Sequence, residues 1–203
     1  MNTNFTEINN IIHIDYSMYL DIIKKHLSQE KVEHCVSTAI YAYYVTKTIH
    51  KDDIQKKVII ASILHDLCRE WSVSDMLTKA KEWNVPITLY EEKYPVLLHG
   101  PLSANMAQRE LNVNDKEIYE AIYWHTTGKR NLGIVGQILY LSDFCEPLRS
   151  YKQAPITRDI FEQEGFDSAL LYVAEERFKL TLKKREPSPH SLDFLTWLQQ
   201  KKV

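Results

Sequence analysis

The sequence predicts an all-α fold, and three observations support that prediction. Only 5 of the 203 residues are glycine. Apolar residues recur at helical spacing along almost the whole chain, and no alternating pattern of useful length indicates a strand. The length suits one domain with a substantial hydrophobic core. We therefore expect a single helical domain over residues 16–203, preceded by a frayed or weakly docked lead-in segment over residues 1–15.

The first half of the chain is expected to contain three helices. They cover, in order, residues 18–27, 31–50 and 54–68. The second of them carries His34 near its start. The third is almost entirely apolar inside and should therefore be central, with Asp52 and Asp53 placed to cap its amino end. His65 and Asp66 come near its carboxyl end.

Capping and breaking residues divide the second half into shorter helices. Capping boxes are expected at Ser72 with Asp75, at Thr88 with Glu91, and at Asn114 with Glu117. The expected helices cover residues 101–111, 116–125, 133–146, about 167–184, and a last segment ending near residue 201. Pro101 suits a first helical turn, and Pro147 stops the strongly apolar helix before it. A proline-rich turn at 186–190 precedes the last helix.

The composition excludes several classes of protein. A formal net charge of −2 argues against a nucleic-acid-binding protein, which usually carries a basic surplus. The three cysteines show no paired spacing, which favours a reducing compartment over a disulfide framework. The amino terminus lacks the pattern of a signal peptide, and no apolar run approaches the ~18 residues of a membrane span. We expect a soluble cytoplasmic protein without nucleic-acid or membrane partners.

A set of histidines and aspartates points to a divalent metal site. The set comprises His34, the doublet His65-Asp66 and Asp143. Both aspartates follow strongly apolar runs, and burying a carboxylate there is costly unless a cation compensates its charge. Imidazole and carboxylate together suit a borderline-to-hard cation, which favours hydrolysis of phosphate esters or phosphoanhydrides. The competing interpretation is two aspartates that are paired independently of each other.

Two further histidines stand at expected helix boundaries, and more than one role is open to them. His99 precedes one helix, and His125 ends another before the run Thr126, Thr127 and Gly128, which offers hydrogen-bond donors without bulk. Either histidine could contact phosphate or ligate a second metal ion. We favour phosphate contact or general-acid catalysis; the remaining alternative is a histidine that only caps its helix.

The motifs around these residues resemble a known family. The segments at residues 99–113, 121–133 and 138–149 are similar to the bacterial HD-domain symmetrical diadenosine tetraphosphatases, the YqeK family. The resemblance runs from about His34 to Arg149 and continues more weakly toward the carboxyl terminus. It implies a single HD-domain helical bundle that hydrolyses diadenosine tetraphosphate to two ADP. It also implies iron as the metal, with manganese, cobalt or magnesium as alternatives.

The resemblance also assigns roles to individual residues. The metal ligands would be His34, His65, Asp66 and Asp143. The nucleotide polyphosphate would contact His99, His125, Thr126, Thr127, Gly128 and Arg149. Lys31 and Arg69 stand where the family tends to place basic residues, and both could neutralise phosphate charge. As catalytic residues we expect Asp66 to orient or deprotonate the attacking water, and His99 or His125 to protonate the departing ADP.

The sequence departs from the family pattern in two places. The stretch at residues 191–198 lacks the asparagine expected before its penultimate aromatic residue, and residues 142–147 differ from the commoner version around Asp143. Two alternatives therefore stay open: another HD-domain nucleotide phosphohydrolase or phosphodiesterase, and a nucleotide-binding sensor with an idle metal site. The expected partners are small-molecule nucleotides, such as dinucleoside polyphosphates and their diphosphate products. The number of metal ions and the formation of a homodimer are left open.

Overall fold

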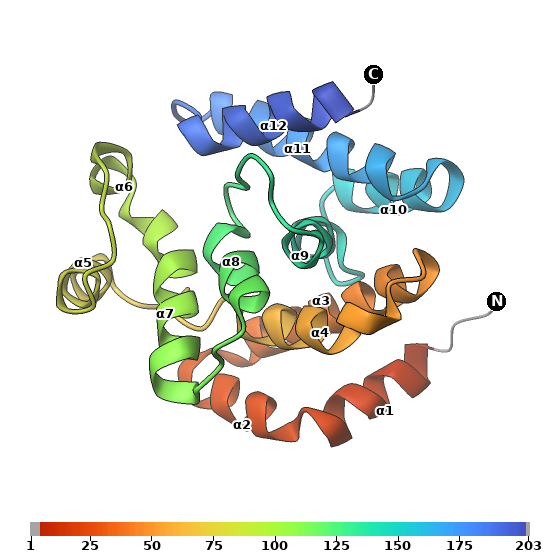
Figure 1. Cartoon of the computed structure of the whole chain (residues 1–203), viewed down its shortest axis with the longest axis horizontal. Helices are drawn as coiled ribbons and strands as arrows, with labels where there is room; N and C mark the ends of the chain where they lie inside the picture. The colour runs from red at the N-terminus through yellow and green to blue at the C-terminus, as the bar shows by residue number, and fades with distance from the viewer. Residues whose placement is uncertain (1–4, 202–203) are drawn as a thin grey trace.

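The computed structural model describes residues 5–201, and these form twelve α-helices and two short 3₁₀ helices without a strand (Figure 1). The predicted all-α fold is confirmed. Within this described range, no helix combines the length and the apolar character that crossing a membrane requires.

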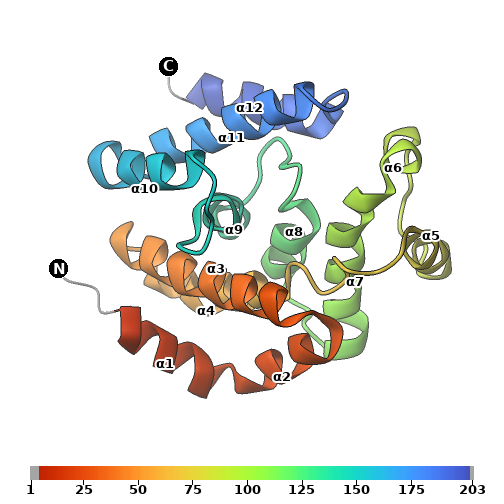
Figure 2. The same cartoon turned by 180° about the vertical axis from the view of Figure 1, so that it is seen from behind.

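Three helices form the centre of the molecule. Helix α3 (Gln29–Thr48) packs along α4 (Gln55–Leu64), and α9 (Ile134–Cys145) lies against both of them (Figures 1 and 2). Every residue from Val58 to Leu64 in α4 is buried, as is every residue from Val135 to Cys145 in α9. The prediction that the two most apolar helices are innermost is confirmed, because apolar residues around a whole helix need neighbours on all sides.

The prediction of a weakly docked lead-in is wrong for residues 5–15. This segment forms α1 (Phe5–Asp15), which packs against α3 and is followed by α2 (Ser17–His26). Ile8 and Ile12 are four residues apart, so they share one face of the helix, and both are fully buried. Residues 1–4 of the expected lead-in lie outside the described residues.

A second group of helices flanks the centre. It comprises α5 (Val73–Glu82), α6 (Leu89–Lys93), the 3₁₀ helix η2 (Pro95–Leu98), α7 (His99–Leu111) and α8 (Lys116–Trp124). The capping boxes bring the chain into α5 and α6 as predicted: Ser72 accepts a hydrogen bond from the backbone N–H of Asp75, and Thr88 and Glu91 cap each other's backbone. Helix α7 begins at His99, two residues before the proline that suits its first turn.

Two predicted caps are wrong. The cap of α8 is Asp115 rather than Asn114; its carboxylate accepts the backbone N–H groups of Glu117 and Ile118. Asp115 also forms an ion pair with Lys57 at 3.0 Å, which a neutral asparagine one position earlier could not provide. Asp52 belongs to the 3₁₀ helix η1 (Asp52–Ile54), where its backbone carbonyl, not a side chain, accepts the N–H of the first residue of α4.

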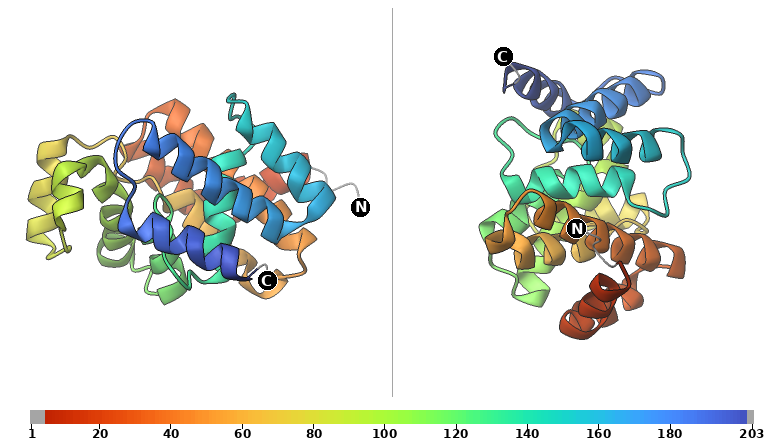
Figure 3. Two further views of the ribbon diagram at one scale, coloured as in Figure 1. Left: turned by 90° about the horizontal axis from the view of Figure 1, so that it is seen from above. Right: turned by 90° about the vertical axis from the view of Figure 1, so that its right-hand side faces the viewer.

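The carboxyl-terminal helices form a layer over α9. They are α10 (Gln153–Glu164), α11 (Phe166–Leu182) and α12 (Pro189–Lys201), and α11 contacts both α9 and α12 (Figure 3). The predicted helices near residues 167–184 and up to residue 201 are confirmed. Helix α10 is not predicted by the sequence pattern, because it buries only a narrow stripe of three residues, Ala154, Thr157 and Phe161.

Candidate metal centre

Six side chains singled out from the sequence converge at the middle of the molecule, and all six are buried. They are His34 from α3, His65 and Asp66 directly after α4, His99 at the start of α7, His125 directly after α8, and Asp143 near the end of α9. Their nitrogen and oxygen atoms form three overlapping groups, and within each group the potential ligand atoms lie within 4.8 Å of one another. The structure therefore brings together every residue of the predicted set.

The cluster has two halves that share His65. The Asp143 half consists of His34, Asp143, Glu146, Arg149 and Arg177. The Asp66 half consists of Asp66, His99 and His125. The Nε2 atom of His65 lies between the halves, 3.7 Å from a carboxylate oxygen of Asp66 and 3.7 Å from one of Asp143.

In the Asp66 half, one carboxylate faces two different sets of imidazoles. Its Oδ1 atom lies 3.3 Å from Nε2 of His99 and 3.5 Å from Nε2 of His125. Its Oδ2 atom lies 3.7 Å from Nε2 of His65 and 4.0 Å from Nε2 of His34. Asp66 therefore stands between two groups of nitrogen atoms, as a bridging carboxylate would.

In the Asp143 half, the carboxylate is held by the protein's own cations. Oδ1 of Asp143 lies 2.9 Å from Arg149 and 3.1 Å from Nε2 of His34, and Oδ2 lies 2.7 Å from Arg177. Arg177 comes from α11 and its guanidinium carbon also lies 4.4 Å from the centre of the Tyr140 ring. This half is an ion-pair network in its own right.

Hydrogen bonds determine how all four imidazoles are oriented. Three of them place Nδ1 next to the backbone carbonyl three residues earlier: His65 at 2.8 Å from Ser62, His99 at 2.5 Å from Val96, and His125 at 2.8 Å from Ile122. A carbonyl can only accept, so each Nδ1 carries the hydrogen and each Nε2 of the neutral ring is left with a lone pair. His34 is oriented instead by the carboxylate of Glu146, 3.1 Å from its Nδ1.

The charges of the cluster follow from burial and from these neighbours. Burial raises the pKa of Asp66, but His65, His125 and His99 outweigh it and hold the pKa well below its usual range. Burial likewise opposes ionisation of Asp143, and Arg177 together with His34 keeps its pKa well below the usual value. Burial lowers the pKa of both His99 and His125, so these rings are neutral near pH 7.

The donor set fits one or two divalent metal ions. The Nε2 atom of His65 is buried and has no hydrogen-bond partner among the described residues. The Nε2 atoms of His99 and His125 lie 3.1 Å apart, each with a lone pair. The hydroxyl oxygen of Thr126 lies 3.3 Å from Nε2 of His99 and 3.1 Å from Nε2 of His125, and its single hydrogen can satisfy only one of them. Because buried acceptors need a partner, a cation bound by imidazole and carboxylate would complete both halves.

The predicted basic residues lie around this centre in different ways. Lys31 reaches it directly, with Nζ 3.6 Å from Oδ2 of Asp66 and a quarter of its side chain exposed (25%). Arg149 is tied to Asp143 and lies 3.5 Å from Glu146. Arg69 follows the doublet in the turn after α4, near enough for its charge to help lower the pKa of His99.

The predicted turn after α8 lies beside the centre. The hydroxyl of Thr126 contacts the two histidines, whereas that of Thr127 donates to the carbonyl of Gly128 at 3.1 Å. Gly128 is buried, has φ +67°, and a Cβ added there would lie 2.3 Å from the ring of Phe194. The structure thus requires glycine at this position for packing; a contact between Gly128 and substrate remains a prediction.

The sequence did not point to two residues that complete the Asp143 half. Glu146 is almost fully buried and lies three residues after Asp143, so helical spacing next to a suspected ligand was an available signal. Arg177 donates to Asp143 and to the backbone carbonyls of Tyr140, His125 and Thr126. Nothing in the sequence near Arg177 connects it to the cluster, because only the packing of α11 on α9 brings it there.

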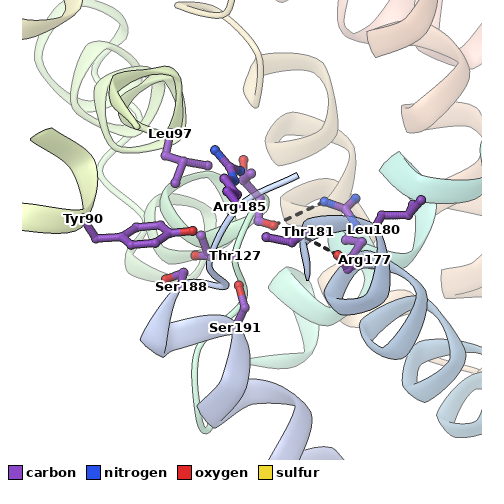
Figure 4. A pocket seen from close by; sticks show the side chains of 10 residues that line it. Tyr90, Leu97, Thr127, Arg177, Leu180, Thr181, Arg185, Ser188 and Ser191 are labelled. Atoms are coloured by element: carbon purple, nitrogen blue, oxygen red, sulfur yellow. Dashed lines mark hydrogen bonds between the residues drawn. The ribbon is translucent and has the colours of Figure 1, made fainter. Parts of the chain in front are cut away.

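Two cavities adjoin the metal centre at the turn formed by Thr126 and Thr127. One has a volume of about 190 Å³ and lies between α6, α11 and the start of α12 (Figure 4). The other has a volume of about 260 Å³ and lies beside α6, α7 and the end of α8. Both are lined by Leu97, Thr126 and Thr127, so the two cavities meet at this turn.

Comparison with known proteins identifies relatives across most of the chain. The family model for the HD domain matches residues 32–148. A protein of Bacillus subtilis named "Bis(5'-nucleosyl)-tetraphosphatase, symmetrical" is 27% identical over 180 residues, which cover 88% of this chain and 95% of that protein. A protein of Staphylococcus aureus with the same name is 25% identical over 165 residues, covering 81% and 84%.

A solved structure supports the fold. The crystal structure of a Clostridium acetobutylicum protein, described as a "predicted HD superfamily hydrolase involved in NAD metabolism", superimposes with a TM-score of 0.85. The match covers 92% of this chain and 97% of that one, at 20% sequence identity. At this level of identity the similarity establishes a shared fold.

Proposed function

The chain belongs to the HD-domain family, and we propose that it is a metal-dependent hydrolase that cleaves diadenosine tetraphosphate symmetrically into two ADP. The observation that carries the proposal is the convergence of four imidazoles, each presenting Nε2, on two buried carboxylates. The names of the relatives from Bacillus subtilis and Staphylococcus aureus support the substrate, because both are similar to this chain over more than four fifths of its length.

We propose that the cluster holds two metal ions, with iron as the first candidate and manganese, cobalt or magnesium as alternatives. One ion would be held by His34, His65, Asp66 and Asp143. The other would be held by Asp66, His99 and His125. The sequence favours a phosphate contact or a general acid for the two last histidines. The neutral rings and inward lone pairs support the ligand alternative instead, because a ring without a hydrogen on Nε2 has none to give a leaving group from that atom.

When bound, a divalent ion here would polarise phosphate oxygens and lower the pKa of water toward neutrality. The basic residues at the rim act on the polyphosphate chain. Lys31 and Arg69 would bind oxygens of the central phosphates and offset the charge that develops on them. Arg149 would hold Asp143 in place through its ion pair. Because Arg149 is only partly buried, it could also contact a phosphate of the substrate.

Symmetric cleavage needs water to attack one of the two central phosphorus atoms. The oxygen of water forms a bond to that phosphorus, the bond to the bridging oxygen breaks, and the bridging oxygen departs with the second ADP. Asp66 would orient the water; its lowered pKa makes it a weak base, which favours orientation over proton abstraction. Protons released in the reaction would leave through the exposed rim near Lys31.

Product analysis tests the proposed reaction. Metal-loaded protein incubated with diadenosine tetraphosphate should yield ADP alone, resolved by ion-exchange chromatography. A mixture of ATP and AMP would contradict symmetric cleavage. Release of free phosphate from nucleoside mono- or triphosphates, without cleavage of the dinucleotide, would favour another HD-domain phosphohydrolase. Tight nucleotide binding without turnover under iron, manganese, cobalt or magnesium would favour a sensor.

A further inference from the structure

The two cavities beside the metal centre are too small to act separately. Their volumes of about 190 and 260 Å³ each fall short of the roughly 300–1,000 Å³ that small-molecule pockets span. Taken together they reach that range, and they share Leu97, Thr126 and Thr127 in their walls. Thr126 also contacts the histidines of the Asp66 half. A ligand that fills both cavities would therefore pass next to the metal centre.

The chemistry of the two cavities differs. The smaller one carries more polar groups: Figure 4 shows the hydroxyls of Tyr90, Ser188 and Ser191 on one side and Arg185 in its wall. Arg177 also lines it, but its guanidinium donates to Asp143 and to backbone carbonyls. Arginine and hydroxyl groups bind phosphate oxygens and ribose hydroxyls. The smaller cavity, here called the basic cavity, is suited to the anionic part of a nucleotide.

The larger cavity is lined mainly by flat apolar surfaces. Its wall contains Tyr123, Trp124 and His190, together with Pro86 and Pro101. The rings of Tyr123 and Trp124 have centres 4.7 Å apart, and those of Trp124 and His190 have centres 4.6 Å apart. All three side chains are only partly buried, so part of each ring remains available to a ligand. This cavity is called the aromatic cavity below.

We propose that the aromatic cavity binds one purine base of the nucleotide substrate, with Trp124 as the principal stacking surface. The inference rests on the proposed function and goes beyond it by naming where a base is held. Aromatic rings stack on bases whatever their sequence, whereas a base in the basic cavity would displace phosphate from Arg185. Trp124 lies two residues before Thr126, so the chain itself links the base site to the metal centre.

Binding measurements with two probes separate base recognition from phosphate recognition. ADP and inorganic tripolyphosphate are each titrated by calorimetry into metal-loaded wild-type protein and the variants Trp124→Leu and Trp124→Phe. Trp124→Leu should weaken ADP binding roughly 5- to 100-fold, the range of one lost base–aromatic stack, and change tripolyphosphate binding by less than about twofold. Trp124→Phe keeps a ring and should lose clearly less affinity for ADP.

A matched control comes from another partly exposed tryptophan. Trp71 packs on Trp83 and lines neither cavity, so Trp71→Leu should leave the binding of both probes unchanged. Metal content and helical circular dichroism confirm that each variant is loaded and folded. Should Trp124→Leu fail to fold, Trp124→Phe and His190→Ala carry the same comparison, because His190 contacts Trp124 from the start of α12.

Two results would overturn the inference: ADP affinity within about twofold of wild type in Trp124→Leu, or an equal loss of affinity for ADP and tripolyphosphate. The proposed function is judged separately by product analysis. Wild-type protein that binds ADP in a Trp124-dependent way but does not cleave the dinucleotide would retain the base site and refute the hydrolase. If wild-type protein releases only ADP and Trp124→Leu does not change ADP binding, the hydrolase is retained and the base site is refuted.

Discussion

The two halves of the metal centre are held together by different means. In the Asp66 half, His99 and His125 are oriented by backbone carbonyls three residues earlier in the chain, at the ends of η2 and α8. In the Asp143 half, orientation comes from side chains: Glu146 holds His34, and arginines from the turn after α9 and from α11 hold Asp143. The first half is local and the second depends on the packing of distant helices.

The halves also differ in how charge is balanced. Asp143 forms ion pairs with Arg149 and Arg177 at 2.9 and 2.7 Å. Asp66, among the described residues, has Lys31 at 3.6 Å as its cationic partner besides the histidines. The Asp143 half is therefore a preformed ion-pair network, whereas the Asp66 half is expected to reach charge balance only with metal. Four substitutions test this difference.

The largest effect on activity is expected for Asp66→Asn. Asp66 faces both proposed metal sites, so the variant should lose bound metal. Turnover should fall by more than about 100-fold, because even the residues that support metal ligands contribute about 10–100-fold to metal affinity or activity. The free energy of unfolding of the metal-free protein should fall less than in Asp143→Asn, because the partners of Asp66 are Lys31 at 3.6 Å and histidines, whereas Asp143 is paired with the buried Arg177 at 2.7 Å. Metal analysis and urea denaturation measure the two properties. Asp21→Asn, at an exposed position on α2, is the control. An Asp66→Asn protein that keeps its metal and turnover would disprove the assignment.

Asp143→Asn should lower turnover, by less than Asp66→Asn, and should also destabilise the fold. The substitution leaves Arg177 buried without its carboxylate partner, and breaking a buried pair costs about 3–5 kcal/mol. Urea denaturation of metal-free protein should show a larger loss for Asp143→Asn than for Asp66→Asn. Equal stabilities of the two metal-free variants would remove the distinction between the halves.

His125→Ala separates the two proposed metal sites. The variant loses one of the three ligands of the second site and none of the first, so bound metal should fall from two ions per chain to one. Mass-spectrometric metal analysis of protein purified under excess metal gives the stoichiometry. Unchanged metal content with slower turnover would instead support the phosphate-contact role that the sequence favours.

Glu146→Gln is expected to have the smallest effect. The carboxylate accepts from Nδ1 of His34 but does not face the metal site, and such supporting residues contribute about 10–100-fold to metal affinity. Competition with a chelator measures the affinity, and Glu33→Gln, exposed on the same helix as His34, serves as control. An affinity equal to that of wild type would show that His34 is oriented without Glu146.

The helices predicted correctly share a strong local signal. Helices α4 and α9 are apolar around their whole circumference, and the turns before α5 and α6 carry capping residues whose hydrogen bonds span only a few positions. Two elements were not predicted. Over residues 6–15, α1 buries Ile8 and Ile12, and α10 buries three residues; in each helix they form a narrow stripe. Such a stripe can be recognised only when the helix it packs against is known, because weak periodicity in the sequence does not distinguish a docked helix from a loop.

By itself, the sequence determined the six potential ligands and the local geometry of three of them. A histidine directly after a helical turn can bond to the carbonyl three residues earlier, and that short-range bond sets the direction of its free nitrogen. Only the tertiary structure decided that Asp66 stands between two groups of imidazoles and that Arg177, 34 residues beyond Asp143, neutralises it. The physical reason is that charge compensation acts through space at a few ångströms, and helix packing sets those distances.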